Sequence, residues 1–336
     1  MKWSPKLRTL RRGIRLATRI VKARIDRPAA RPASPDAEIP AQSSIDSSRL
    51  VEFNGFGDNP GRLRMRAYLP PRTAGNPLVV LLHGCGQDAA VFAQDSGWIA
   101  LADRLHIPLI LPEQAEANNA GRCFQWFQPA ETARDHGEAG SIAEMVRAAT
   151  IRLGSDPHRI FVVGLSAGGA MAAALLAAYP DLFAAGAAVA GLPVGSARSG
   201  IQAMLRMAAA CPDQSPEASA ASARANAPAG FTGPWPRLSV WQGEADTTVA
   251  PENATLLATQ WCTLQGLTME ESDEQLRHGV RHRMWPGDTD RRVELWSLPH
   301  LPHGYPVGTR VVTPGHFVEQ APVDATAEIA RFFGLD

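Results

Sequence analysis

The sequence predicts an α/β protein with a mostly parallel, doubly wound sheet and helices on both of its faces. From about residue 50 onward, short apolar runs alternate with longer segments of helical periodicity. Runs such as residues 78–82 are apolar throughout, as expected of strands that helices cover on both faces. A third observation is the glycine-rich turn at residues 164–169, which joins an apolar run to a run of small residues.

The alternation assigns most elements of this sheet in chain order. The predicted strands are residues 62–69, 78–82, 107–111, 159–164, 185–190, 238–242 and 293–298. The predicted helices are residues 98–105, 141–153, 167–178 and 251–265. Helices thus lie between most of the strands, which is typical of parallel strand connections.

The distribution of charge separates the N-terminus from the rest of the chain. The chain has 336 residues and a formal net charge of zero, but eleven of its 33 basic residues and one of its 33 acidic residues lie in residues 1–31. The remainder is therefore acidic, which argues against a nucleic-acid-binding enzyme. Because 45% of the residues are hydrophobic and 20% are charged, the acidic part is expected to be one globular domain.

Residues 3–25 predict a basic amphipathic helix, with apolar side chains at spacings of three and four. Residues 28–48 are rich in Pro, Ala and Ser and predict a linker. The predicted division is therefore an N-terminal segment, 1–47, and a catalytic domain, 48–336. Two interpretations of residues 1–30 stay open, a passive extension and a surface that docks on a polymer granule or an anionic membrane.

The predicted location is cytoplasmic. No stretch approaches the roughly 20 apolar residues of a membrane span, and basic residues such as Arg15 and Arg19 interrupt any signal-peptide core. The alternative is a secreted protein whose true start differs from Met1. The four cysteines form no C-x-x-C pair, so a zinc site is not expected.

Ser166 is the predicted nucleophile. It lies in a G-x-S-x-G pattern between a predicted strand and a predicted helix, the context that this motif requires. Such a turn strains the serine backbone and projects its hydroxyl above the sheet. Glycines are needed on either side because a side chain would collide with the neighbouring strand or helix.

A serine hydroxyl needs a base, and the base needs a group that orients it. On this type of sheet an acid and then a histidine follow the serine along the chain. The predicted acid is Asp246, which lies just past the apolar run at residues 238–242. Glu244 is its competitor.

The predicted base is one of three histidines that follow the last predicted strand: His300, His303 and His316. His303 is preferred because it precedes Gly304 in a turn that can aim the imidazole back at the sheet. The pair at 300 and 303 lacks the glutamate of a zinc protease motif. Neither a metal ion nor an organic cofactor is expected.

Two backbone amides are predicted to stabilise the oxyanion of the reaction. One is the amide of Ala167, directly after the nucleophile. The other is the amide of Cys85, in the turn at residues 83–87 that follows an early strand. Amides in these positions stabilise negative charge that develops on a carbonyl oxygen.

Four motifs in chain order carry a family resemblance: Leu-His-Gly-Cys-Gly-Gln at 82–87, Cys-Phe-Gln-Trp-Phe at 123–127, Gly-Leu-Ser-Ala-Gly-Gly at 164–169 and Trp-Gln-Gly-Glu-Ala-Asp-Thr-Thr-Val at 241–249. The chain resembles the polyhydroxybutyrate depolymerase family, close to feruloyl and acetylxylan esterases, over roughly residues 48–336. The resemblance implies an α/β-hydrolase fold and a triad of Ser166, Asp246 and His303. Many members are secreted and have a disulfide at the positions of Cys85 and Cys123, a bond that the expected cytoplasmic location leaves open here.

Three aromatic residues are candidate walls of a substrate pocket: Trp126, Phe127 and Trp261. Such rings hold acyl chains or stack on aromatic acids, and each can instead be a core residue. Residues 192–236 form a long insertion, which is either a lid-like segment over the site or a disordered loop. Polar residues at 134–138, Glu138 among them, are expected to cap and position the helix from residue 141.

These residues predict a serine carboxylic-ester hydrolase that acts through an acyl-enzyme. The preferred substrates are hydroxyalkanoate polyesters of the polyhydroxybutyrate type, or their oligomers. The alternative is a feruloyl or acetylxylan esterase that acts on plant polysaccharide esters. An alternative of another class is a non-catalytic protein that binds granules or membranes through residues 1–30.

Overall fold

The computed structural model describes residues 48–211, 214–287, 292–309 and 315–335. The chain divides into two units, Met1–Ser44 and Ile45–Asp336, and all described residues belong to the second. The predicted amphipathic helix and nearly all of the predicted linker lie outside the described residues. Within the described ranges, no helix combines the length and the apolar character needed to cross a membrane.

The described strands form a ten-stranded sheet in the order β1-β2-β4-β3-β5-β6-β7-β10-β9-β8, and a separate pair, β11-β12. Their bounds are β1 Leu50–Glu52, β2 Arg64–Tyr68, β3 Leu78–Leu82, β4 Leu109–Glu113, β5 Ile160–Leu165, β6 Ala185–Val189, β7 Arg237–Gly243, β8 Asp273–Arg277, β9 Val280–Pro286, β10 Arg292–Leu298, β11 Tyr305–Gly308 and β12 Val318–Ala321. The six strands from β4 to β10 in the sheet are parallel, and the outer strands β1, β2, β9 and β8 pair antiparallel.

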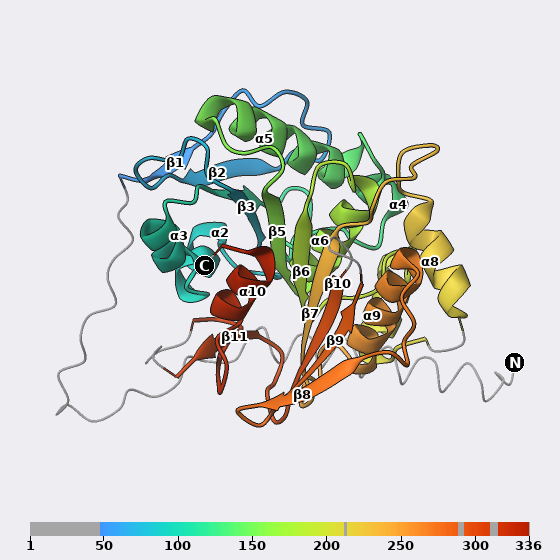
Figure 1. Ribbon diagram of the computed structural model, residues 1–336. Coiled ribbons are helices and arrows are strands. Elements are labelled where there is room, and N and C mark those ends of the chain that lie inside the picture. The colour runs from blue at the N-terminus through green and yellow to red at the C-terminus, as the bar shows by residue number, and fades with distance from the viewer. Residues whose placement is uncertain (1–47, 212–213, 288–291, 310–314, 336) are drawn as a thin grey trace, which may run out of the picture. The chain divides into compact units, whose positions relative to one another are not determined.

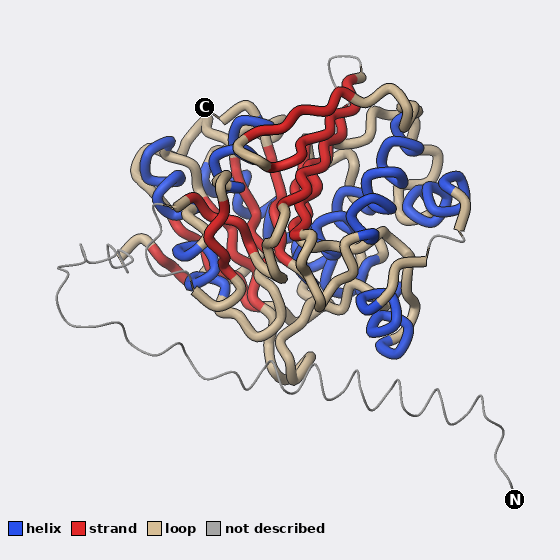
Figure 2. The backbone as a smooth tube through the Cα atoms, turned by 90° about the horizontal axis from the view of Figure 1, so that it is seen from below, coloured by secondary structure: helices blue, strands red, loops and turns tan. Residues whose placement is uncertain are grey.

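Helices cover both faces of this sheet (Figures 1 and 2). Their bounds are α2 Ala89–Asp95, α3 Trp98–Leu105, α4 Pro129–Thr132, α5 Gly137–Leu153, α6 Ala167–Ala178, α7 Gly200–Ala208, α8 Pro216–Arg224, α9 Glu252–Gln265 and α10 Ala325–Phe333. One face packs against α5, α6, α8 and α9, and the other against α2, α3 and α10. The predicted fold class, a mostly parallel sheet between two layers of helices, is confirmed.

Strand β3 shows how the sheet separates two cores. Leu78, Val80 and Leu82 pack into the core that includes α5 and α6, whereas Val79 and Leu81 pack into the core of α2, α3 and α10. Side chains of a strand alternate between faces, so a strand that is covered on both sides has to be apolar throughout. This is the physical reason why the central strands could be found from composition.

The seven predicted strands occur within two residues of their expected limits at each end, and α3 and α6 have the predicted bounds. The hairpin of β8 and β9 was not predicted, because every residue of β8 except the last is exposed and the pattern is polar. Its turn residues, His278 and Gly279, have φ angles of 51° and 79°. Two consecutive positive φ angles are typical of a tight type I′ hairpin.

The insertion at residues 192–236 contains two helices, α7 and α8. The side chain of Gln260 on α9 anchors it, because its amide oxygen accepts from Val194 N–H at 2.9 Å and its amide nitrogen donates to the Val194 and Ser219 carbonyls at 3.0 and 2.8 Å. Helix α8 was not predicted, although Ser215 caps it and Pro216 begins it. The part of the insertion that the structure describes is therefore docked on α9.

Candidate active site

The turn between β5 and α6 has the strained geometry that the sequence predicts. Ser166 has φ 57° and ψ −117°, a conformation that residues other than glycine rarely adopt. A Cβ atom on Gly164 would lie 2.1 Å from the Gly168 carbonyl oxygen, and one on Gly168 would lie 2.3 Å from the Leu82 carbonyl oxygen. Both glycines are therefore required by the close passage of β5, α6 and the end of β3.

Ser166, His303 and Asp246 form a continuous chain of hydrogen bonds. His303 Nε2 lies 3.0 Å from Ser166 Oγ, and His303 Nδ1 lies 2.6 Å from Asp246 Oδ2. With the imidazole neutral, Nδ1–H donates to the carboxylate and Nε2 accepts the serine proton. The structure thus brings together the three residues that the sequence predicts, in the arrangement of a nucleophile, a base and an orienting acid.

The carboxylate of Asp246 is fixed on both oxygens. Oδ1 accepts from the amides of Thr248 and Val249 at 2.7 and 2.9 Å, and Oδ2 accepts from Gln242 Nε2 at 3.0 Å in addition to His303. Burial alone would raise the pKa of Asp246, but the hydrogen bond and charge of His303 and the two amides lower it overall. The acid therefore stays ionised and orients the imidazole.

Two loops converge to place the acid against the base. The Glu244 amide donates to the Leu298 carbonyl at 2.9 Å, and the Ala245 amide donates to the Leu301 carbonyl at 3.1 Å. A Cβ atom on Gly243 would lie 2.3 Å from the Leu301 oxygen, so only glycine permits this approach. Because β7 and β10 are parallel neighbours, the loops that follow them emerge at the same edge of the sheet.

The competing acid and the competing bases lie elsewhere. The Glu244 side chain is 41% exposed and faces Arg281 at 3.9 Å. His300 and His316 are both exposed.

The ring of His303 is packed edge-on against Phe317, with a centroid distance of 5.6 Å. Phe317 was not predicted, and no local pattern marks its contribution.

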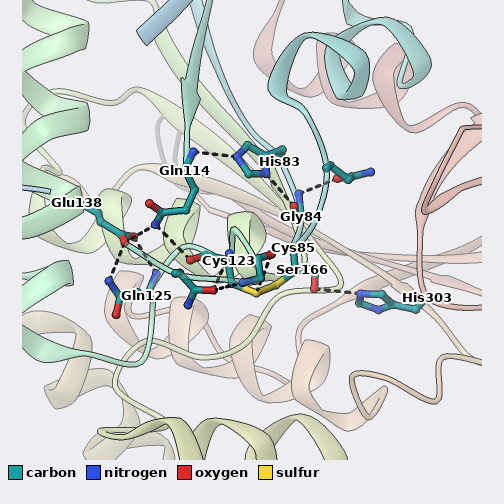
Figure 3. Close-up of a disulfide and its surroundings, with 12 residues drawn as sticks. His83, Gly84, Cys85, Gln114, Cys123, Gln125, Glu138, Ser166 and His303 are labelled. Carbon is teal, nitrogen blue, oxygen red and sulfur yellow. Dashed lines mark hydrogen bonds between the residues drawn. A yellow bond between two sulfur atoms is a disulfide. The ribbon is translucent and has the colours of Figure 1, made fainter. Parts of the chain in front are cut away.

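The turn that carries Cys85 is tied to a second loop. Cys85 forms a disulfide with Cys123 (Figure 3), so the bond that the sequence left open is present. A Cβ atom on Gly168 would lie 2.3 Å from the Leu82 carbonyl oxygen and 2.6 Å from that of His83, so this turn begins beside the start of α6. The first amides of a helix lack intrahelical acceptors, which leaves the Ala167 amide free to face a substrate oxygen.

His83 shapes this turn. Its Nε2 accepts from the Gln114 amide at 3.2 Å, so its Nδ1–H donates to the Gly84 carbonyl at 2.7 Å. Burial, the largest effect, lowers the pKa of His83 to about 4. The ring is therefore neutral and acts as a fixed link between β3 and the loop after β4.

The pocket candidates separate into two groups. Trp126 is 8% exposed and meets Phe127 edge-on at a centroid distance of 5.7 Å. Phe127 is half-buried and lies near Gly200, at the start of α7. Trp261 is fully buried, and its indole N–H donates to the Pro236 carbonyl at 2.7 Å. The interpretation of Trp261 as a pocket wall is wrong, because helix α9 turns this residue into the core.

Glu138 lies in the first turn of α5, as expected of an acid at a helix start, but its side chain does not cap the helix. Helix α5 begins at Gly137, and the Glu138 carboxylate is buried against the side chains of Gln114 and Gln125. Arg134 pairs with Asp181, with 2.7 Å between Nη1 and Oδ1.

In the described ranges, no three His, Cys, Asp or Glu side chains are grouped so that they could hold a metal ion.

Comparisons with known proteins show that the chain is similar to esterases. A family model described as esterase PHB depolymerase matches residues 63–283. Poly(3-hydroxyalkanoate) depolymerase C of Paucimonas lemoignei is 36% identical over 304 residues, 88% of this chain and 73% of that protein. Feruloyl esterase B of Talaromyces stipitatus is 30% identical over 276 residues, 80% of this chain and 76% of that protein.

The solved structures include an acetyl xylan esterase from Aspergillus awamori with a TM-score of 0.72 and 25% identity. The match covers 85% of this chain and 99% of that one. The predicted resemblance is confirmed, since the family model spans more than half of the chain. The chain is a carboxylic ester hydrolase of the α/β-hydrolase fold and belongs to the PHB depolymerase family of esterases.

Proposed function

We propose that Ser166, His303 and Asp246 are the catalytic triad of this ester hydrolase. His303 Nε2 takes the hydroxyl proton as Ser166 Oγ attacks the ester carbonyl carbon. The alcohol leaves with that proton, and a water molecule activated by His303 then hydrolyses the acyl-enzyme. The observation that carries this proposal is the unbroken chain of hydrogen bonds from Ser166 to Asp246.

The amides of Ala167 and Cys85 are proposed to hold the oxyanion during both steps. Ala167 is the first residue of α6 and Cys85 lies in the turn after β3, and the close passage of Gly168 and the end of β3 brings these two segments side by side. Losing one such donor typically costs about 3 kcal/mol of transition-state stabilisation. The strained backbone of Ser166 supports the assignment, because strain of this kind is concentrated at functional sites.

Replacing Ser166 with Ala is expected to lower kcat for a soluble 4-nitrophenyl ester by about 10⁴-fold or more, because the nucleophile is lost. Ser155→Ala is the matched control, since Ser155 is also a buried serine but precedes β5 rather than following it. Its activity should stay at the wild-type level. Activity that survives Ser166→Ala in a pure preparation would refute the assignment.

Hydroxyalkanoate polyesters or their oligomers are the proposed substrates. A poly(3-hydroxyalkanoate) depolymerase is the relative with 36% identity. In addition, α7 exposes an apolar face, with Ile201 70% and Leu205 55% exposed, and the helix begins near Phe127. Exposed apolar patches mark interaction sites, and such a face suits a water-insoluble polyester better than a hydrated polysaccharide.

The second candidate substrate class is the feruloyl or acetyl esters of plant polysaccharides. Feruloyl esterase B and an acetyl xylan esterase are among the similar proteins. The edge-on pair of Trp126 and Phe127 would suit an aromatic acid. This class is placed second because the identity to those proteins is lower.

A direct comparison of substrates distinguishes the two classes. At equal concentrations, kcat/KM for a 3-hydroxybutyrate oligomer is expected to exceed that for methyl ferulate by at least about tenfold, a difference of 1.4 kcal/mol. Ser166→Ala serves as the blank for both substrates. A preference for methyl ferulate would move the assignment to polysaccharide esters.

Residues 1–30, which lie outside the described residues, are proposed to bind a polyester particle or an anionic membrane surface. The support is their charge, since residues 1–31 hold eleven basic residues and one acid. Deleting residues 1–45 should lower the fraction of protein that sediments with polyester particles and leave kcat/KM for a soluble ester unchanged. Unchanged sedimentation would show that these residues are a passive extension.

Secretion, the alternative to the cytoplasmic location expected from the sequence, is the proposed location, and the disulfide supports it because cytosolic thiols are normally kept reduced. Cys85 and Cys123 are bonded, whereas Cys211 and Cys262 are free. Protein isolated from its native cells and denatured without reductant is expected to titrate two thiols per chain. Four thiols, the number expected after reduction, would favour the cytoplasm.

A further inference from the structure

Glu138 is a buried acid for which the proposed mechanism has no role. It is the second residue of α5, and its residue exposure is 0%. Its Oε1 accepts from Gln114 Nε2 at 2.6 Å and from Gln125 Nε2 at 3.4 Å, and its Oε2 accepts from the Gln125 amide at 2.8 Å. Every partner of this carboxyl group is therefore an N–H donor in the described part of the chain.

The contacts of Glu138 lead to the turn that carries Cys85 (Figure 3). Gln114 Nε2, besides its bond to Glu138, donates to the carbonyl of Cys123 at 3.2 Å. Cys123 is the disulfide partner of Cys85. Along a second path, the Gln114 backbone amide donates to His83. Glu138 thus holds Gln114 and the segment from Cys123 to Gln125, and the Cys85 turn is attached to both.

This hydrogen-bond pattern fits only one protonation state of Glu138. A carboxylate accepts from all three donors, whereas a protonated carboxyl would place its own hydrogen against an N–H group. Burial, the largest effect, raises the pKa of Glu138 to about 7, and the charge of Glu131 on α4 raises it further, against the donors that lower it. The balance between the two forms therefore lies near neutral pH.

We propose that Glu138 is a positioning residue for the oxyanion hole: its carboxylate holds the Gln114 and Gln125 segments, and through them the Cys85 amide, and its protonation loosens this hold. The inference rests on the proposed role of the Cys85 amide. The loop that carries Cys123 is also bonded to this turn directly, because Gly86 N–H donates to the carbonyl of Gly121 at 2.8 Å.

Protonation of Glu138 should lower kcat but should raise the contribution of Glu138 to the stability of the fold. Between pH 4.5 and about 7 the folded state binds more protons at Glu138 than the unfolded state does, so the contribution of Glu138 to stability falls as pH rises through this window. The carboxylate that supports catalysis forms over the same window. The lowered pKa of His83 has the opposite effect on stability between about 4 and 6.5, so the comparison has to be made between variants that share His83.

The test compares wild type with Glu138→Gln on 4-nitrophenyl acetate from pH 5 to pH 9. Gln keeps the shape but presents an N–H group to a donor, so kcat is expected to fall about tenfold above pH 8 with KM within about twofold. The ratio of the two kcat values should approach one below pH 6, where the wild-type acid is protonated as well. Taking the ratio cancels the pH dependence that both proteins share.

Glu144→Gln is the matched control, because Glu144 is on the same helix and its side chain is 33% exposed. Its kcat ratio to wild type should be one at every pH. A ratio for Glu138→Gln that does not change with pH, or a kcat equal to wild type, would overturn the inference. Wild-type hydrolysis that is lost in Ser166→Ala establishes the proposed function separately, so that either assignment can fail alone.

Gln114→Ala tests the same link if Glu138→Gln does not fold. It keeps the buried carboxylate and its two contacts with Gln125, and removes the amide that joins Glu138 to the Cys123 carbonyl. It also removes the side-chain oxygen that accepts from the Ala115 amide at 3.0 Å and from Asn118 Nδ2 at 2.9 Å. A similar loss of kcat at pH 8, with KM unchanged, is expected. A kcat equal to wild type in this variant would contradict the proposed path to Cys85.

Discussion

The close passage of three backbone segments at Gly164 and Gly168 is the constraint on which the site depends. Two glycines allow α6 to begin directly over the ends of β3 and β5, with backbone atoms where any side chain would collide. The strained φ of Ser166 follows from this crossing. The same crossing brings the turn after β3 to the nucleophile, so one packing requirement places both the attacking oxygen and the proposed oxyanion donors.

The remaining catalytic groups reach this point because of the sheet order. Strands β5, β6, β7 and β10 are parallel neighbours, so the loops that follow them open on one edge, where ligands bind in sheets of this type. The loops after β7 and β10 are bonded to each other before they present Asp246 and His303. The distance between acid and base is therefore set by backbone contacts rather than by side chains that reach across an open cleft.

Much of the fold and the triad could be predicted because both follow from local patterns. Central strands are apolar on both faces, and the order of serine, acid and histidine reflects the strand order. The edge hairpin of β8 and β9 could not be predicted from the sequence because β8 is polar and exposed. For Trp261 the sequence left a pocket wall and a core position open, because helical periodicity does not reveal which face of a helix meets the sheet. The contacts of Glu138 join residues 13 and 24 positions apart, and no local pattern encodes them.

The two ends of the main sheet differ from its centre in a way that affects association. A strand at a sheet edge offers unpaired N–H and C=O groups to other chains. At one end β1 has only three residues, and at the other β8 carries charged, exposed side chains, with Glu274 facing Arg281 and Arg283 of β9. Short and charged edges are the features by which soluble proteins prevent sheet extension. Growth of this sheet by strand addition from a second molecule is therefore disfavoured at both ends.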